Sequence, residues 1–251
     1  LININMNHAD ILQLAGLRSD GRRSREIRRI RCRFGPVNHQ GYDGSAYIEQ
    51  GQTKILCVLR GPHEPDRRSD ASDEGCLIKV QYAQAAFAGT ERKQRRVTDR
   101  RSAEVCRAVQ ETLAGAVCRE LYPRSQIDVY LHVLQTDGGE LPCAINAASL
   151  ALVDAGVAAR DMAVACAAGR VAGETVVDLN YMEQNSGGVY LPVAILPKRN
   201  KIVLAMMDSK LPLEVFEEVL QVAMEACQEV YSVLQNEVRE HASKVLSSRL
   251  G

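Results

Sequence analysis

The segment Ile127–Ala155, IDVYLHVLQTDGGELPCAINAASLALVDA, contains the pattern that decides the fold. Residues 127–135 alternate between apolar and polar side chains, which predicts a half-buried strand. Residues 141–155 are rich in alanine and predict a helix whose small side chains would let it lie close against a sheet. A polar turn, Asp137–Gly139, separates the two. The segment therefore predicts a strand and a helix packed together in an α+β protein.

Similar units occur on both sides of this segment. We expect a half-exposed basic strand at 27–35, further strands at 44–50, 53–61, 76–86, 162–171, 175–180, 189–196 and 202–208, and helices at 102–122 and 213–247. This order resembles a β-β-α-β-α unit that occurs twice. Because the connections are short, we predict one compact α+β domain at 15–251, with an N-terminal extension at 1–14 and two halves at about 15–157 and 158–251.

The composition is that of an ordinary globular protein. The chain has 251 residues, of which 46% are hydrophobic and 25% are charged. No apolar run reaches the length of about 18 residues that a transmembrane helix needs, and the first residues lack the pattern of a secretory signal. The eight cysteines form no C-x-x-C pair and no zinc spacing. We expect buried, reduced thiols and an intracellular protein.

Positive charge is concentrated in two places, although the net charge is zero. Residues 18–33 include eight arginines against two acidic residues, and residues 92–107 include six arginines and one lysine against two acidic residues. Such clusters suggest a localised anionic partner, such as a nucleic acid backbone. The alternative is solvated helix and strand faces. The preference for arginine favours phosphate contact, because the guanidinium group can bind phosphate oxygens through two hydrogen bonds.

The second cluster has the stronger pattern for binding. Arg92, Arg95 and Arg96 precede a predicted helix, and Arg100 and Arg101 lie at its start. Backbone amides at a helix N-terminus together with arginines can hold phosphates. Cations at this end oppose the helix dipole, which is unfavourable unless an anion lies between them. We therefore predict contact with an RNA or DNA backbone, with a solvated loop as the alternative.

Two other places could take part in chemistry. The turn Asp137–Gly139 could approach a ligand closely, but Glu140 and Leu141 follow it where a phosphate site would need a hydroxyl group or an arginine. Asp178 and Glu183 are five residues apart, so on a continuous strand they would point to opposite faces and could bind a metal together only across a bulge. We expect each to be solvated or paired separately. The sequence contains no P-loop, dinucleotide fingerprint or H-E-x-x-H motif.

A series of motifs in a fixed order resembles one known family. The motifs are RSDGRR (18–23), DGSAYIEQGQTK (43–54), GPHE (61–64), ERKQRR (91–96), DRRS (99–102), YPRSQIDVYLHVLQTDGG (122–139), NAASLALVDAGV (146–157), RDM (160–162), DLNYMEQNSGG (178–188) and MDSKL (207–211). Together they resemble the RNase PH family of phosphorolytic ribonucleases, over about residues 15–248. The resemblance implies the RNase PH fold, a duplicated β-β-α-β-α arrangement like domain 2 of ribosomal protein S5.

The resemblance also implies partners and a place in the cell. Members of this kind assemble into a ring of six RNase PH-like subunits, as in the core of the RNA exosome, with S1/KH cap proteins on one face and RNA in the central channel. Separate exonucleases associate with the eukaryotic ring. We therefore expect a heteromeric ring, RNA and associated exonucleases as partners, no membrane, roles in rRNA processing and mRNA turnover, and localisation in the nucleus, nucleolus and cytoplasm.

The resemblance further implies that catalysis has been lost. The RNA-binding loop of active members matches the loop with Arg92, Arg95, Arg96, Arg100 and Arg101. The phosphate-binding turn and the acidic positions of active members fall on four residues that cannot play these roles, namely Glu140, Leu141, Gly188 and Tyr190. We expect a subunit that binds RNA without cleaving it and has no cofactor or metal. The alternatives are an active phosphate-dependent 3′–5′ exoribonuclease and a structural spacer without RNA contact.

Overall fold

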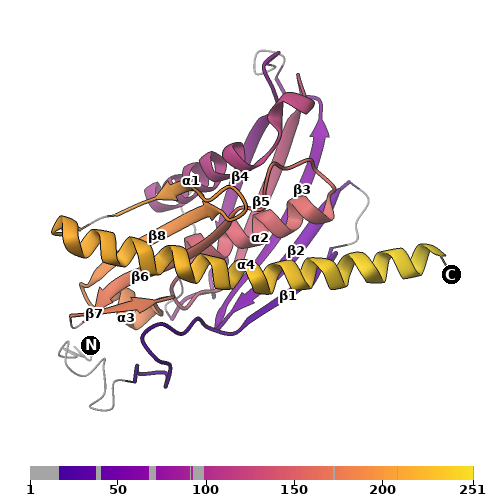
Figure 1. The fold of residues 1–251 in the computed structure, drawn as a ribbon. Helices are drawn as coiled ribbons and strands as arrows, with labels where there is room; N and C mark the ends of the chain where they lie inside the picture. The colour runs from indigo at the N-terminus through magenta and orange to yellow at the C-terminus, as the bar shows by residue number, and fades with distance from the viewer. Residues whose placement is uncertain are drawn as a thin grey trace.

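The computed structural model describes residues 17–37, 41–67, 72–90, 92, 99–171, 173–207 and 209–250, which form two sheets and four α-helices (Figure 1). The N-terminal extension predicted at 1–14 lies outside these residues. The first sheet has the order β1-β2-β3-β5-β4, with β1 (Ile30–Phe34), β2 (Gly44–Gln50), β3 (Thr53–His63), β4 (Leu77–Gln84) and β5 (Gln126–Gln135). The second has the order β7-β6-β8-β9, with β6 (Val164–Val171), β7 (Glu174–Val177), β8 (Val189–Leu196) and β9 (Lys201–Ala205). Only the β4–β5 pair is parallel within these strands.

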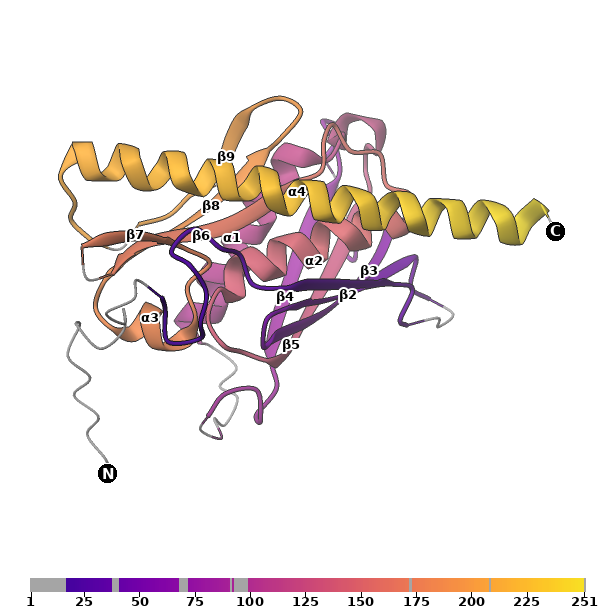
Figure 2. The same ribbon diagram turned by 60° about the horizontal axis from the view of Figure 1, so that its bottom comes forward.

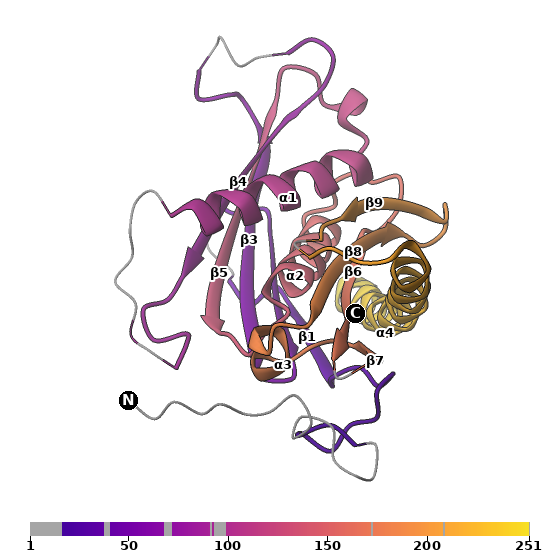
Figure 3. The same cartoon turned by 90° about the vertical axis from the view of Figure 1, so that its left-hand side faces the viewer.

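The helices form layers with the sheets. They are α1 (Arg100–Ala116), α2 (Glu140–Asp154), α3 (Tyr181–Asn185) and α4 (Leu213–Leu250). In Figure 3 the first sheet, the pair α1 and α2, the second sheet and α4 follow one another across the molecule. Figure 2 shows α4 covering the outer face of the second sheet and extending past it toward the C-terminus. The predicted α+β fold, with two halves in which strands are followed by helices, is confirmed, and each half has its own sheet.

Helix α2 lies at the centre because most of its side chains are small or apolar on every side. Every residue from Leu141 to Leu152 is buried, as expected for a helix enclosed by protein. A Cβ atom at Gly44 of β2 would lie 2.6 Å from the carbonyl oxygen of Ala151, so the helix and the first sheet are in direct contact there. On the other side, Asn146 exchanges two hydrogen bonds with the backbone of Ala165 at the start of β6, at 2.8 and 2.9 Å. The same helix thus joins both sheets.

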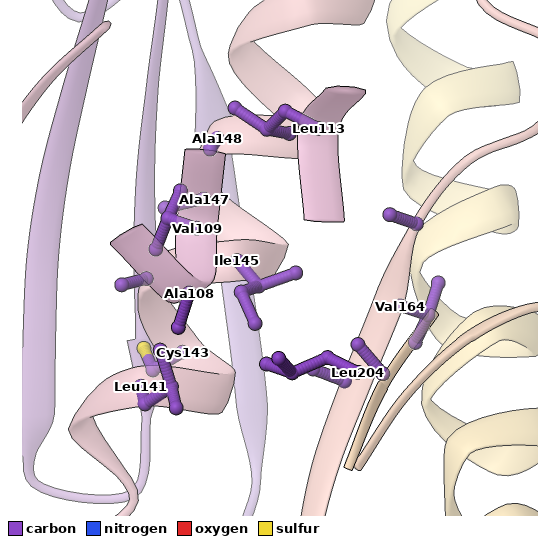
Figure 4. Close-up of a cluster of buried hydrophobic side chains, with 14 of the residues drawn as sticks. Ala108, Val109, Leu113, Leu141, Cys143, Ile145, Ala147, Ala148, Val164 and Leu204 are labelled. Atoms are coloured by element: carbon purple, nitrogen blue, oxygen red, sulfur yellow. The ribbon is translucent and has the colours of Figure 1, made fainter. Parts of the chain in front are cut away.

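The core surrounds α2 (Figure 4). Val109 and Leu113 of α1 pack beside it, and Val164 and Leu204 extend the same cluster into the second sheet. All eight cysteines are free, and five of them are buried. Burial raises the pKa of the Cys57 thiol well above its ordinary value, so this side chain stays protonated and inert. Among the described residues, no helix is both long and apolar enough to cross a membrane.

Several predicted boundaries differ from the structure by two or more residues, and two of these differences have a clear structural reason. The helix expected to continue to Pro123 ends at Ala116, because Val117 is extended and forms a bridge with Ala159. The strand expected at 175–180 ends at Val177, because Asp178 has a positive φ of 53° and the chain then enters α3. Asp178 and Glu183 therefore do not lie on one strand, and the argument about opposite strand faces does not apply to them.

Candidate RNA-binding cleft

A cleft of about 720 Å³ opens where the N-terminal ends of α1 and α2 meet α3 and β8. It brings together six of the residues singled out in the sequence, Arg100, Arg101, Glu140, Leu141, Gly188 and Tyr190. These residues come from three separate parts of the chain, so only the fold makes them neighbours. Arg92 is exposed, and Arg95 and Arg96 lie outside the described residues.

The arginine side of the cleft is the first turn of α1. The side chain of Arg101 is 65% exposed, and Arg100 is exposed beside it. Asp99 is the N-cap, and its carboxylate accepts a hydrogen bond from the backbone N–H of Arg101 at 3.4 Å. This carboxylate already supplies an anion at the positive end of the helix dipole. The expectation that the arginines require an external anion there is therefore wrong, and their exposure is the better argument for binding.

Glu140, which also lines the cleft, is held firmly in place. It is the first residue of α2, and its side chain is only 13% exposed. The Thr136 hydroxyl donates to one carboxylate oxygen, and the Tyr82 hydroxyl donates to the other at 3.2 Å. Arg101 lies 3.5 Å from that second oxygen. Burial and the nearby Glu140 charge raise the pKa of Tyr82, so its hydroxyl remains a donor. The carboxylate has its own partners and occupies the N-terminal end of α2.

The other three positions are also unsuited to binding phosphate or moving protons. Leu141 is 8% exposed and belongs to the hydrophobic core, where Figure 4 draws it. A Cβ atom at Gly188 would lie 2.5 Å from the carbonyl oxygen of Arg170, so the backbone excludes a side chain. Tyr190 packs on Val171, Val176 and Leu179. Burial, with the charges of Glu140 and Asp178, raises the pKa of Tyr190, so it stays a neutral phenol.

The turn that precedes Glu140 is fixed from behind by Arg28. This arginine donates to the carbonyl oxygens of Asp137 at 2.8 Å and Gly138 at 3.3 Å. It also pairs with Asp178, with 2.7 Å between Nη2 and Oδ1. A Cβ atom at Gly139 would lie 2.6 Å from the Arg28 guanidinium, and its φ of +62° also favours glycine. One buried ion pair thus connects the N-terminal segment, the turn and the second half of the protein.

A second buried pair fixes α3. Arg18 donates from Nε to Glu183 Oε1 at 2.7 Å and from a second nitrogen to Oε2, and both side chains are at most 1% exposed. The Asn180 side chain accepts from the backbone N–H of Glu183, while the Glu183 side chain accepts from the backbone N–H of Asn180. These reciprocal bonds form a capping box. Asp178 and Glu183 are therefore paired separately with different arginines, which was one of the two alternatives expected from the sequence, the other being that each is solvated. No three His, Cys, Asp or Glu side chains in the described ranges are grouped as a metal site.

The first arginine cluster is only partly a surface feature. Arg18 and Arg28 are buried in ion pairs, and Arg22 donates to the Glu26 and Asp178 carbonyl oxygens. The interpretation of the whole cluster as a basic patch is wrong for these three residues, because acidic side chains and carbonyl groups from both halves of the protein take up their charge. The sequence analysis also missed Tyr82 and Thr136 as partners of Glu140, and no local sequence signal marks contacts between such distant segments.

Comparisons with known proteins identify the family of the chain. Residues 26–158 match domain 1 of the 3′ exoribonuclease family, and residues 161–226 match domain 2. The chain is 43% identical to exosome complex component RRP41 of Bos taurus, over 94% of this chain and 96% of the relative. It is 40% identical to exosome complex component ski6 of Schizosaccharomyces pombe, over 97% and 99%. It is also 40% identical to exosome complex component Rrp41 of the archaeon Thermococcus gammatolerans, over 94% of each chain.

Solved structures show the same fold. Rice (Oryza sativa) Rrp46 superposes with a TM-score of 0.77 at 24% identity, over 88% of this chain and all of that one. A chain of the Archaeoglobus fulgidus exosome with RNA bound to the active site superposes with a TM-score of 0.73 at 22% identity, over 87% and 92%. Two matching domains and long relatives of 40–43% identity agree with the motifs and the fold. The chain belongs to the RNase PH family of 3′ exoribonucleases.

Proposed function

We propose that this chain is an RNA-binding subunit of an exosome core ring and does not itself cleave RNA. The observation that carries the proposal is the composition of the cleft. It keeps exposed Arg100 and Arg101 for the RNA backbone, but has Glu140 and Tyr190 at positions where the family resemblance implies a phosphate-binding hydroxyl and an acid. Relatives of 40–43% identity are named exosome components, which supports the place in a ring.

Electrostatics at Glu140 oppose the binding of inorganic phosphate. A phosphate ion at the Asp137–Gly139 turn would face a carboxylate that Thr136 and Tyr82 hold in place. Two like charges at close range repel strongly where little water screens them. The two arginines beside the turn are already engaged, since Arg101 lies next to that carboxylate and Arg28 pairs with Asp178 behind the turn. The RNA backbone can still contact Arg100 and the free part of Arg101, because the cleft is open on their side.

The acid needed for phosphorolysis has no replacement at the two matching positions. Gly188 has no room for a side chain, and the raised pKa of Tyr190 keeps its phenol from exchanging a proton near neutral pH. The Schizosaccharomyces pombe and Thermococcus gammatolerans relatives are both 40% identical to this chain. Overall identity therefore does not tell whether a member of the family is catalytically active. The argument for silence therefore rests on these individual positions.

The partners and the location follow from the same proposal. We place the chain in a heteromeric ring with other RNase PH-like subunits, S1/KH cap subunits and associated exonucleases. Its work there is to support the ring and guide RNA for rRNA processing and mRNA turnover. We place this ring in the nucleus, the nucleolus and the cytoplasm. Identification of the proteins that co-purify with the tagged chain tests the partners, and the absence of other RNase PH-like chains would contradict them.

The proposed lack of catalytic activity is tested with the complex purified through a tag on this chain. RNA and inorganic phosphate are added, and released nucleoside diphosphates are separated by chromatography. We expect none, because hydrolytic exonucleases in the complex release monophosphates. Diphosphate release that disappears in an Arg100→Ala/Arg101→Ala variant and persists in Arg107→Ala would overturn the proposal. Arg107 is the matched control, since it is an exposed arginine on the same helix that pairs with Glu111 outside the cleft.

RNA binding is tested by the salt dependence of affinity. Each phosphate contact with single-stranded RNA contributes about 0.7 to the slope of log K against log salt. Arg100→Ala/Arg101→Ala should therefore weaken binding and reduce the slope by up to about 1.4, while Arg107→Ala leaves both unchanged. Equal affinity and slope in all three proteins would favour a structural spacer without RNA contact.

A further inference from the structure

We infer that a smaller hollow beside the cleft is a base-binding subsite, in which the Tyr181 ring stacks on a nucleobase of single-stranded RNA. The inference rests on the proposed function, since the arginines must first hold the RNA backbone nearby. It adds a binding residue and a ligand group to the cleft. No motif or acidic position discussed above assigns a role to Tyr181.

The hollow shares its boundary with the cleft. Its volume is about 170 Å³, and Arg101, Glu140 and Tyr181 line both spaces. A nucleotide whose phosphate lies against Arg101 can therefore place its base in the neighbouring hollow. The remaining wall comes from the end of β4 and the following turn and from Thr136 and Asp137. Amide, hydroxyl and carboxylate groups on this wall can face the polar edge of a base while the ring face meets Tyr181.

Tyr181 is available for such a contact. It is 44% exposed, and its hydroxyl makes no hydrogen bond with any residue that the structure describes. The other aromatic ring that lines the cleft, Tyr190, is already engaged, since it packs on the second sheet. Exposed aromatic rings beside arginines are the usual means by which proteins hold single strands without reading their sequence.

The backbone that carries Tyr181 is held in place. Tyr181 is the first residue of α3, between the N-cap Asn180 and Glu183, which is buried against Arg18. A Cβ atom at Gly138 would lie 2.6 Å from the carbonyl carbon of Asn180 and 2.7 Å from the nitrogen of Tyr181, so the turn and α3 are in contact. A ring that is already positioned loses little conformational freedom on binding. The carboxylates of two buried ion pairs, Asp178 and Glu183, thus flank this exposed tyrosine in the chain.

The first test compares affinities of the purified complex for a short single-stranded RNA and for versions with one abasic position each. Tyr181→Ala should weaken binding of the intact RNA by about 5-fold or more, because stacking one base contributes a factor of this size. Tyr181→Phe keeps the ring and should bind like the original protein. An abasic change at one position of the RNA should weaken binding to the original protein by a similar factor. The same change should not weaken binding to Tyr181→Ala any further. Tyr42→Ala is the matched control, because Tyr42 is 45% exposed and lines neither space.

The second test assigns the contact to this chain. The RNA carries 5-iodouridine at the position where the abasic change weakens binding most. It is irradiated in the complex, and the cross-linked residue is identified by mass spectrometry. We expect a cross-link at Tyr181. The loss of affinity in Tyr181→Ala should also stay constant as salt is raised, unlike the loss in Arg100→Ala/Arg101→Ala, because stacking releases no counterions.

The outcomes separate this inference from the proposed function. RNA binding that depends on Arg100 and Arg101 but is unchanged in Tyr181→Ala, with no cross-link, would overturn the base subsite alone. A complex that falls apart in Tyr181→Ala, as shown by size-exclusion chromatography, would assign the ring to a protein interface and also overturn it. A complex that binds no RNA would overturn both.

Discussion

The two arginine clusters look alike in the sequence and have opposite surroundings in the fold. In the first, the side chains of Arg18 and Arg28 are 0% and 5% exposed and pair with Glu183 and Asp178. In the second, Arg101 is 65% exposed at the mouth of a cleft. The number of charges in a segment therefore does not tell whether they bind a partner. Both clusters meet carboxylates of the chain, but the pairs of Arg18 and Arg28 are buried whereas Arg101 stays exposed beside Glu140.

The two regions are also joined, because the buried pairs hold the elements that line the cleft. Arg28 binds the Asp137–Gly139 turn from behind, and Arg18 holds α3 through Glu183. The second half of the protein supplies both carboxylates. Loss of catalytic side chains from the cleft need not disturb this support, and the support by itself gives no activity. On the proposed function, this separation lets the chain keep its architecture and the exposed arginines of the cleft without the catalytic side chains.

The largest expected effect is on the buried pairs. Arg28→Met leaves Asp178 as a buried charge without its main partner and should lower the free energy of unfolding by about 3–5 kcal/mol. Arg29→Met is the matched control, since the neighbouring Arg29 is exposed and such a change should stay within about 0.5 kcal/mol. Urea unfolding of the purified chain measures both. Equal losses in the two variants would contradict the difference between buried and exposed arginines.

A smaller effect should appear at acid pH. Burial raises the pKa of Asp178, but the charge and hydrogen bonds of Arg28 lower it by more, so the folded pKa lies below the ordinary value of 3.8. A carboxylate with a depressed folded pKa stabilises the protein above its unfolded pKa, and this contribution is lost as pH falls through the folded pKa. The free energy of unfolding should therefore decrease as the pH is lowered below 3.8.

The matching variant is Asp178→Asn, which cannot titrate. It should be less stable than the original protein at neutral pH, and the difference between the two should shrink as the solution becomes acidic. Urea unfolding at a series of pH values measures this difference. If it stayed constant at acid pH, the ion pair with Arg28 would not be the source of the stability.

A third change tests α3 without removing an ion pair. Asn180→Ala removes the N-cap side chain but leaves Arg18 and Glu183 in place, and should cost about 1 kcal/mol. Ser186→Ala, at the other end of α3, removes only a local hydrogen bond to the Glu183 carbonyl oxygen and serves as the comparison. A loss of the size expected for Arg28→Met would mean that the cap and the ion pair act as one unit.

Much of the fold could be predicted because periodicity marks long elements well. The strands 44–50 and 189–196 were predicted with the bounds that the structure has, and α2 within one residue at each end. The short helix α3 was missed, because five residues are too few for a helical period. Its capping box, Asn180 with Glu183 three residues later, was the available signal. The cleft positions were found through the family motifs, whereas the partners of Glu140 depend on contacts between segments far apart in the chain.

The smallest expected effect on stability belongs to the second cluster. Arg101 is mostly exposed and lies 3.5 Å from Glu140, so this pair contributes little. Arg101→Ala should change the unfolding free energy by less than about 0.5 kcal/mol while it weakens RNA binding. The same urea unfolding and RNA titrations measure both quantities. A loss of stability close to that of Arg28→Met would show that the cleft arginine is a structural residue, and the difference between the clusters would disappear. Loss of RNA affinity at unchanged stability would show that exposure, and not the number of arginines, separates binding from support.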